Sequence, residues 1–324
     1  MIFHLENIYC LIVAGPYGQD RKIDYPPESV PYDAIKILTG DLGSKLLTKF
    51  PAEHLPKRPM LAVHDGTILF CGFDPVKGEA CQTVFQFDHG IWKEHSVLNR
   101  KRFGDTVVST PTATFIFGRG TYEYLPVGTT TWLDGGDMKA FLGGCGVAAK
   151  SGEEIWLIDD CYNKAILFCF DVKDHTLRRI NSKFRNVPSG KGRLRCALIP
   201  GTNKIAVTDG LLGLLDTIDT EDGSIGSYCP EFSGLDCGRR NHGMGIVTVN
   251  GENRLAVFGR IYRHDRNPDN ESVELYNPKV KWEWETTNIK FGLPDCHDNF
   301  TSLSVRLGDI ISKLYLFHVY ENNY

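Results

Sequence analysis

The sequence predicts an all-β protein built from repeated four-stranded antiparallel units, and two observations support this prediction. Short runs of four to seven residues rich in Val, Ile, Tyr and Trp alternate with turns rich in Asn, Gly, Pro and Asp, which is the pattern of strands joined by tight turns. One arrangement of these runs also recurs along the chain: two apolar runs joined by a turn and closed by a small or acidic residue. Because one such unit cannot bury both of its faces alone, the units are expected to pack in series.

Pairs of apolar runs mark the first half of each unit. Complete pairs occupy residues 60–72, 106–118, 147–159, 196–209 and 243–259. The N-terminus contributes only a second run, at 8–15, and the matching first run lies near the C-terminus, at 300–307. The closing residues are Gly15, Gly72, Gly118, Asp159, Asp209 and Gly259. They are separated by about 41 to 57 residues, near the length of one propeller blade.

A third and a fourth run complete each unit. The third runs end at Ile37, Phe87, Tyr124, Phe170, Ile218 and Tyr276, and the fourth runs carry Leu46, Trp92, Trp132, Leu177, Ile225 and Trp282. In the last unit these runs are expected at 272–276 and 281–285. Residues 45–50 are the one stretch where a helical turn is compatible with the sequence. The resulting boundaries are 8–56 with 300–307, 58–100, 102–140, 142–190, 193–238 and 240–296 in a single domain over 1–307, and a C-terminal tail at 308–324.

This arrangement resembles the kelch-repeat family, whose blades carry a double glycine after the second strand and then a Tyr and a Trp. Tyr124 with Trp132 and Tyr276 with Trp282 keep that spacing. No unit keeps the double glycine, and some units lack both aromatic residues. The resemblance implies a six-bladed β-propeller in which the C-terminal strand becomes the innermost strand of the N-terminal blade. It also implies roles such as substrate receptor of a ubiquitin ligase or cytoskeletal adaptor.

Composition and charge limit the classes of partner. The net charge of −4 and the isoelectric point near 6.2 give no reason to expect nucleic acid or an anionic membrane. No apolar stretch reaches the length of a membrane span. We expect a monomer whose rim loops select a protein or peptide partner.

The ten cysteines leave the compartment open between cytoplasm and secretion. No CxxC pair suggests a zinc or thioredoxin-type site. The pairs Cys71–Cys81, Cys161–Cys169 and Cys229–Cys237 flank predicted connections. These cysteines are either disulfide-bonded in an oxidising compartment or buried as small apolar side chains.

Basic residues recur just before the predicted innermost strands, and they are the best candidates for a binding site. They are Lys57, Arg58, Lys101, Arg102, Lys191, Arg193, Arg239, Arg240, His242 and His297. A second set follows the second strands, where Arg119, Arg260, Arg263 and His264 alternate with Asp74, Asp159, Asp160 and Asp209. If all blades present these positions to one rim, the guanidinium groups converge around the mouth of the central channel and suit a carboxylate ligand. The alternative is structural: each Arg of the first set hydrogen-bonds backbone carbonyls of the neighbouring blade or caps a turn, and the Asp residues of the second set form interblade salt bridges with the Arg residues.

The sequence favours a non-catalytic module that binds an acidic protein or peptide. GxSxG, HExxH, a phosphate loop and a dinucleotide-binding fingerprint are all missing, so no catalytic, metal-binding or cofactor residues are predicted. Asp160 and Asp209 lack the spacing of a calcium loop. The alternative is a small-molecule enzyme on the same scaffold, such as a sugar-acid isomerase or a lyase-like specifier, because fold alone does not decide function.

Overall fold

The computed structural model describes residues 9–14, 34–39, 43–49, 60–74, 79–89, 91–160, 165–184, 194–208, 215–228, 239–261, 272–276, 284–290 and 301–306. Within these ranges the chain forms strands and turns and contains no helix. The strands make six four-stranded antiparallel sheets. The all-β fold with four-stranded antiparallel units is therefore confirmed.

Each sheet is a meander whose four strands follow one another in sequence, except the sheet that contains the first strand. That sheet joins β24 (Thr301–Arg306) to β1 (Tyr9–Ala14), β2 (Ala34–Thr39) and β3 (Gly43–Lys49). The second sheet comprises β4 (Met60–His64), β5 (Thr67–Asp74), β6 (Glu79–Asp88) and β7 (Ile91–Arg102). The third comprises β8 (Thr106–Ser109), β9 (Ala113–Gly118), β10 (Thr121–Pro126) and β11 (Leu133–Asp137).

The remaining sheets follow the same plan. The fourth comprises β12 (Gly144–Ala148), β13 (Glu154–Asp159), β14 (Ile166–Asp171) and β15 (Thr176–Arg179). The fifth comprises β16 (Arg195–Leu198), β17 (Lys204–Thr208), β18 (Leu215–Asp219) and β19 (Ile225–Tyr228). The sixth comprises β20 (Arg239–Val249), β21 (Glu252–Ile261), β22 (Ser272–Tyr276) and β23 (Trp284–Lys290).

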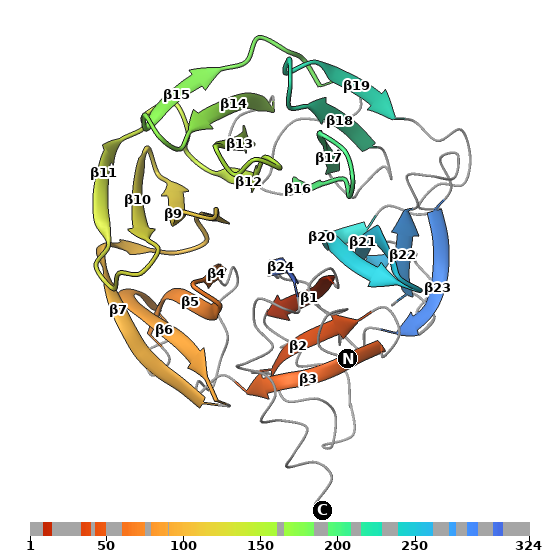
Figure 1. The fold of residues 1–324 in the computed structure, drawn as a ribbon, viewed down its shortest axis with the longest axis horizontal. Helices are drawn as coiled ribbons and strands as arrows, with labels where there is room; N and C mark the ends of the chain where they lie inside the picture. Colours follow the sequence, from red (N-terminus) through yellow and green to blue (C-terminus); the bar gives the residue numbers. More distant parts are fainter. Residues whose placement is uncertain are drawn as a thin grey trace, which may run out of the picture.

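The sheets are arranged around a common centre as the blades of a β-propeller (Figure 1). The innermost strands are β24, β4, β8, β12, β16 and β20, and the peripheral strands are β3, β7, β11, β15, β19 and β23. Neighbouring innermost strands contact one another in the order β4, β8, β12, β16, β20 and β24, and β24 also contacts β4. The starts of the innermost strands and the ends of the second strands therefore share one rim.

Two expectations from the sequence are wrong in detail. Residues 45–49 belong to strand β3, so no helical turn forms there. Strand β23 extends to Lys290, past the expected end at 285, and residues 281–283 lie outside the described ranges. Trp282 and the tail at 308–324 lie outside the described residues.

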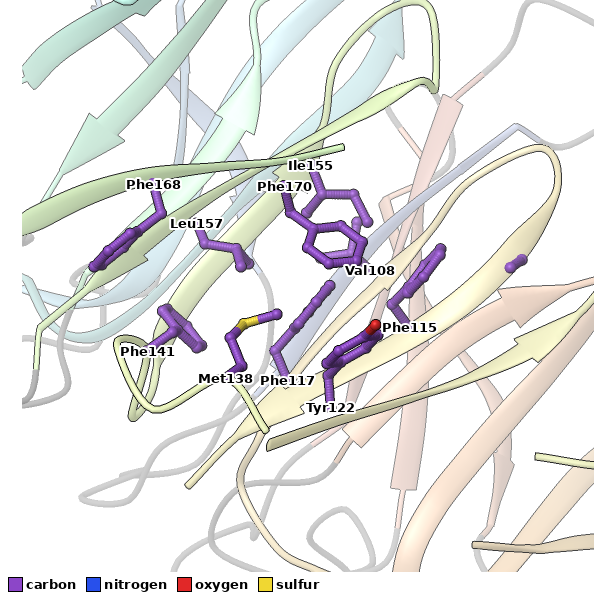
Figure 2. Packing of buried hydrophobic residues seen from close by; sticks show 11 residues of the cluster. Val108, Phe115, Phe117, Tyr122, Met138, Phe141, Ile155, Leu157, Phe168 and Phe170 are labelled. Carbon is purple, nitrogen blue, oxygen red and sulfur yellow. The ribbon is translucent and has the colours of Figure 1, made fainter. Parts of the chain in front are cut away.

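The hydrophobic core lies between the faces of adjacent blades rather than inside any one of them. Between the β8–β11 and β12–β15 blades, Phe117 lies with its ring centroid 5.2 Å from that of Phe170 and 5.9 Å from that of Tyr122 (Figure 2). Met138 and Leu157 belong to the same cluster. This packing confirms that a unit buries its faces only against its neighbours.

Burial explains why the second strands were the clearest in the sequence. All six residues of β9 are buried, because this strand is covered on both faces and flanked by β8 and β10. A strand covered in this way reads as a continuous apolar run. The peripheral strand β15 keeps Leu177 half-buried, and its other three residues are exposed. Peripheral strands therefore carry mixed sequences and are harder to recognise.

Candidate functional site

The structure describes six of the ten predicted binding residues. Side chains are described for Arg102, Arg119 and His242, whereas only backbone positions are described for Arg239, Arg240 and Arg260. Arg58, Arg193, Arg263 and His297 lie outside the described residues.

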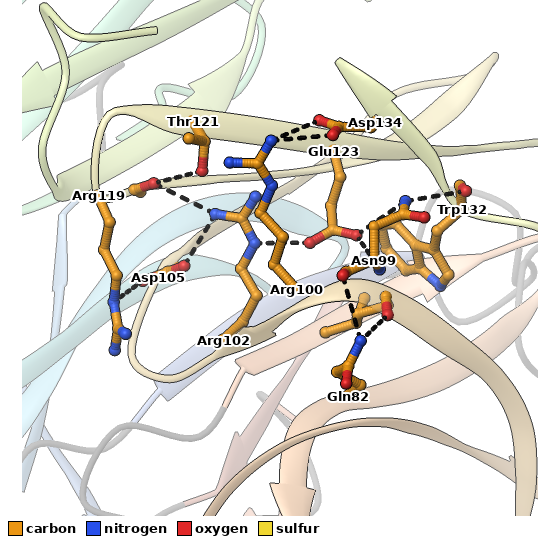
Figure 3. Close-up of polar contacts among 12 residues, drawn as sticks. Gln82, Asn99, Arg100, Arg102, Asp105, Arg119, Thr121, Glu123, Trp132 and Asp134 are labelled. Atoms are coloured by element: carbon orange, nitrogen blue, oxygen red, sulfur yellow. Dashed lines mark hydrogen bonds and ion pairs between the residues drawn. The ribbon is translucent and has the colours of Figure 1, made fainter. Parts of the chain in front are cut away.

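Arg102 is buried between two blades. It ends strand β7, and its side chain is 2% exposed. Its Nε donates to Glu123 Oε1 at 2.6 Å, and its Nη1 donates to Asp105 Oδ2 at 3.1 Å and to the Gly118 carbonyl at 3.2 Å (Figure 3). Because Glu123 lies on β10 of the next blade, the guanidinium bonds the two blades together. The structure thus places Arg102 in an internal ion network, not on an exposed surface where a partner could reach it.

The network around Glu123 extends along β7. The backbone nitrogen of Asn99 donates to Glu123 Oε2 at 2.7 Å, and its side-chain Nδ2 donates to the Trp132 carbonyl at 3.0 Å. Nearby, Arg100 Nη2 donates to Asp134 Oδ2 at 2.9 Å, and both of these side chains are partly exposed. The fourth strand of one blade is therefore held to the third and fourth strands of the next by polar contacts as well as by apolar packing.

A buried carboxylate recurs on the third strand of three blades, and the sequence interpretation missed it. Glu123, Asp216 and Glu274 are 0%, 0% and 5% exposed. In their ladders they lie opposite Ile116, Val207 and Val257. Each of these partners stands two residues before a predicted closing residue, at Gly118, Asp209 and Gly259. The available signal was a single acidic residue inside an otherwise apolar third run.

Arg119 is the exposed counterpart of Arg102. It lies in the turn between β9 and β10, and its side chain is 59% exposed. Its Nε lies 3.6 Å from Asp105 Oδ1, and its Nη2 donates to the Phe103 carbonyl at 3.3 Å. Burial raises the pKa of Asp105, although Arg102 and Arg119 act against this shift. Arg119 can therefore face a ligand on the rim while it partly balances Asp105.

In the sixth sheet the strand register brings two predicted arginines together. Arg240 of β20 pairs with Arg260 of β21. Arg260 follows Phe258 and Gly259 as Arg119 follows Phe117 and Gly118, so the two arginines occupy the same repeat position. Like charges directly opposite each other in a ladder destabilise a sheet. The ladder thus sets two arginine positions opposite each other at this end of the sheet.

His242 lies on β20, and its side chain is buried at 1% exposure. The structure therefore does not present its ring at a surface, in contrast to the expectation of a binding residue. Arg239 pairs with Ile261 at the start of the same ladder.

Two aspartates of the second set connect neighbouring segments. Asp159 Oδ2 accepts a hydrogen bond from the Leu142 amide at 2.7 Å, and Asp160 Oδ2 accepts one from the Leu194 amide at 3.3 Å. Both side chains are buried. Asp159 and Asp160 therefore have a structural role, but these contacts are hydrogen bonds to backbone amides and not the expected interblade salt bridges. Across the described ranges, no group of three or more His, Cys, Asp or Glu side chains is arranged to hold a metal ion.

Six cysteines are described, and all of them are free thiols, including Cys71 and Cys81. The predicted pairs that include Cys161, Cys229 and Cys237 involve residues outside the described ranges.

Comparison with models of known protein families finds no match, and a search of curated proteins finds no related sequence. In the part of the chain that the structure describes, no helix is long and apolar enough to cross a membrane.

Proposed function

We propose that the six sheets form one closed six-bladed ring of the kelch type, in which β24 completes the first blade. The ladder between β1 and β24 supports this closure, because it pairs residues from Tyr9 to Ala14 with residues from Arg306 to Thr301. The Tyr9 amide also donates to Thr248 Oγ1 at 2.7 Å, and the Ile246 amide donates to Ser304 Oγ at 2.7 Å. Through these two bonds, both β1 and β24 of the first sheet are connected to β20 of the sixth sheet.

We propose that this ring is a non-catalytic module that binds an acidic protein or peptide with its rim loops and a basic channel mouth. The pairing of Arg240 with Arg260 is the observation that carries the proposal. Two positive charges opposed across a ladder repel each other, and a bound carboxylate would relieve that repulsion. In the β8–β11 blade the equivalent arginine has a carboxylate of its own blade beside it, since Arg119 lies near Asp105.

The proposed partner is an extended acidic segment rather than a single small anion. Arg119 follows the end of β9, Arg240 lies near the start of β20 and Arg260 near the end of β21, which supports one rim shared by the three residues on two blades. Arginines spread along a rim suit a chain with several carboxylates, because each guanidinium can bind one carboxylate through two hydrogen bonds. The kelch resemblance agrees with a binding role, and we expect the protein to act as a monomer.

The proposal can be tested with a fluorescent oligoglutamate peptide as the probe. Wild-type protein is expected to bind it with an affinity that falls as salt increases. Arg240→Gln and Arg260→Gln should each weaken binding by about tenfold, the effect of losing one charge-assisted contact of roughly 1.4 kcal/mol. Lys93→Gln is the matched control, because Lys93 is an exposed cation that is paired with Asp88 near the β6–β7 turn, on the opposite rim. Equal affinity of the wild type and both arginine variants would refute the basic-mouth site.

A further inference from the structure

Two histidine rings of the β4–β7 blade meet near its boundary with the next blade. His64 ends the innermost strand β4 and is 4% exposed, and His95 lies on the peripheral strand β7 and is half-buried. Their ring centroids are 6.4 Å apart, and the two ring planes are inclined by 73°. Since β5 and β6 lie between these strands in the sheet, the two rings reach toward each other from the inner and the outer strand of the blade.

Each ring is held at its Nδ1 atom by a hydroxyl group. His64 Nδ1 lies 3.1 Å from Thr114 Oγ1 on β9 of the next blade, and His95 Nδ1 lies 2.8 Å from Ser96 Oγ. Trp132 Nε1 donates to the same Ser96 oxygen at 3.0 Å, which leaves that oxygen a second lone pair for His95. In the tautomer with the proton on Nδ1, both rings donate to these hydroxyls and both Nε2 atoms carry a lone pair.

The Nε2 atom of His64 is buried and has no hydrogen-bond partner within the described part of the chain. The Thr129 backbone is near enough to raise the pKa of this ring, but it does not meet Nε2 in hydrogen-bonding geometry. A buried polar atom without a partner is uncommon, and a bound ion is one way to satisfy it. Burial lowers the pKa of both His64 and His95, so both rings are neutral at neutral pH, as metal ligation requires.

We propose that His64 and His95 bind one zinc ion through their Nε2 atoms, with water in the remaining coordination positions. Zinc–nitrogen bonds are about 2.0–2.1 Å long, and each nitrogen lies about 1.2 Å from its ring centre. Two imidazoles on one ion therefore have centroids roughly 5.2 Å apart at a tetrahedral angle and roughly 6.4 Å apart at a linear one. The observed spacing lies at the upper end of this range, and a shift of about 0.6 Å by each ring gives the tetrahedral spacing.

The surroundings of the pair favour a cation. Histidines that bind a metal usually donate their other ring N–H to an oxygen, which fixes the tautomer and the ring orientation, and Thr114 and Ser96 lie where such oxygens are needed. Asp65 follows His64 directly, and its negative charge favours positive charge at the ring. The ion has fewer protein ligands than the three or four of catalytic and structural zinc sites, so it should bind reversibly and leave with a chelator.

The site is separate from the proposed acidic-partner site. His64 stands at the end of its innermost strand, whereas Arg240 stands near the start of β20, so the two positions belong to opposite rims. Because the His64 ring contacts β9 of the next blade, a bound ion should stabilise this boundary between blades.

The test is isothermal titration of the full-length protein with zinc chloride just above neutral pH. Wild-type protein should bind one zinc ion per chain at this site, and the affinity should fall as the pH drops below about 6.5, when the imidazoles become protonated. Cobalt(II) in place of zinc reports the donor atoms, because thiolate ligands add an intense near-ultraviolet band that histidine and water ligands do not. Absence of a saturable site in the wild type, or a thiolate band for the bound cobalt, would overturn the proposal.

Variants assign the binding to the two histidines. His95→Gln and His64→Gln should each weaken zinc binding by more than about tenfold, because losing a ligand costs at least as much as losing a supporting hydrogen bond. His89→Gln is the matched control, since His89 is 51% exposed in the β6–β7 turn of the same blade and bonds to Asp88, and it should bind zinc as the wild type does. Wild-type affinity in His95→Gln would show that the pair is not the site. His95 is half-buried, so this variant decides the question even if His64→Gln does not fold.

Discussion

Replacing Arg102 by Met should destabilise the propeller much more than replacing its neighbour Arg100. The side chains of Arg102, Asp105 and Glu123 are 2%, 5% and 0% exposed, so the substitution leaves two buried carboxylates without their shared cation. Breaking a buried ion pair by removing one partner costs about 3–5 kcal/mol. Arg100 is 40% exposed and bonds to Asp134, which is 47% exposed. Loss of a surface pair of this kind costs less than about 1 kcal/mol.

This free-energy difference converts into a measurable shift of melting temperature. Unfolding entropy is about 2.1 cal/mol/K per residue, which gives roughly 0.7 kcal/mol/K for a cooperative chain of 324 residues. A loss of about 4 kcal/mol therefore lowers the melting temperature by about 6 °C, and the Arg100→Gln control should shift it by less than about 1.5 °C.

Calorimetry or circular dichroism would measure both shifts, and a double-mutant cycle would assign them. Glu123→Gln alone should also be destabilising, whereas Arg102→Met combined with Glu123→Gln should cost less than the sum of the two single changes, because they remove the same interaction. Additive costs, or equal shifts for Arg102→Met and Arg100→Gln, would refute the view that Arg102 serves as an internal counter-ion. Retained binding of the oligoglutamate probe by folded Arg102→Met protein would further separate Arg102 from the proposed binding site.

Three further predictions follow from other parts of the propeller. Burial lowers the pKa of His64 and His95, and for His64 the proximity of His95 lowers it further while Asp65 and the Thr129 backbone oppose the shift. Since the unfolded chain then binds more protons than the folded one, the free energy of unfolding should fall as pH drops below about 6.5; urea titrations should show a weaker fall in His95→Gln, and an unchanged fall would contradict the assignment. Phe117→Ala should cost about 3–5 kcal/mol in urea unfolding because Phe117 is fully buried, whereas Val97→Ala at a 65% exposed position should cost less than about 0.5 kcal/mol; similar costs would argue against this interblade core. Gly72→Ala should destabilise the protein more than Gly201→Ala, although both residues have positive φ. A Cβ on Gly72 would lie 2.6 Å from the Arg102 carbonyl oxygen, whereas one on Gly201 meets nothing within 4 Å. Equal melting temperatures of the two variants would show that the backbone relaxes at Gly72.

The strands that were easiest to predict are those that the fold buries on both faces. Strands β8 and β9 occupy the limits expected from residues 106–118, because continuous apolar sequence and a short turn mark both of them. Peripheral strands are harder to delimit, because β23 continues to Lys290, past the expected end at 285. An outer strand has solvent along one edge and tolerates polar residues. Its sequence therefore does not show at which residues the strand begins and ends. The pairing of β24 with β1 was foreseen because the N-terminus lacked one run and the C-terminus had one to spare.

The candidate site was less predictable because the role of an arginine depends on contacts between blades. Spacing along the chain grouped Arg102 with Arg240, since both precede an innermost strand. The burial of Arg102 follows from Glu123, which is 21 residues downstream and on the next blade. No periodicity in the sequence indicates that Arg102 and Glu123 lie close together in space. The acidic residue within the apolar third run was the available signal, because a buried carboxylate requires a cation or several hydrogen-bond donors.

The recurring carboxylate also separates two roles that the basic residues can have. Glu274 occupies in the sixth sheet the ladder position that Glu123 occupies in the third. The chain there carries two consecutive arginines, Arg239 and Arg240, before the innermost strand turns apolar. Arg240 stands opposite a third arginine, Arg260. The ladder register thus brings three arginine positions to one end of the first two strands of the sixth sheet. We therefore propose that an acidic partner binds at these positions and not at Arg102, whose guanidinium bonds to Glu123 and Asp105 inside the fold.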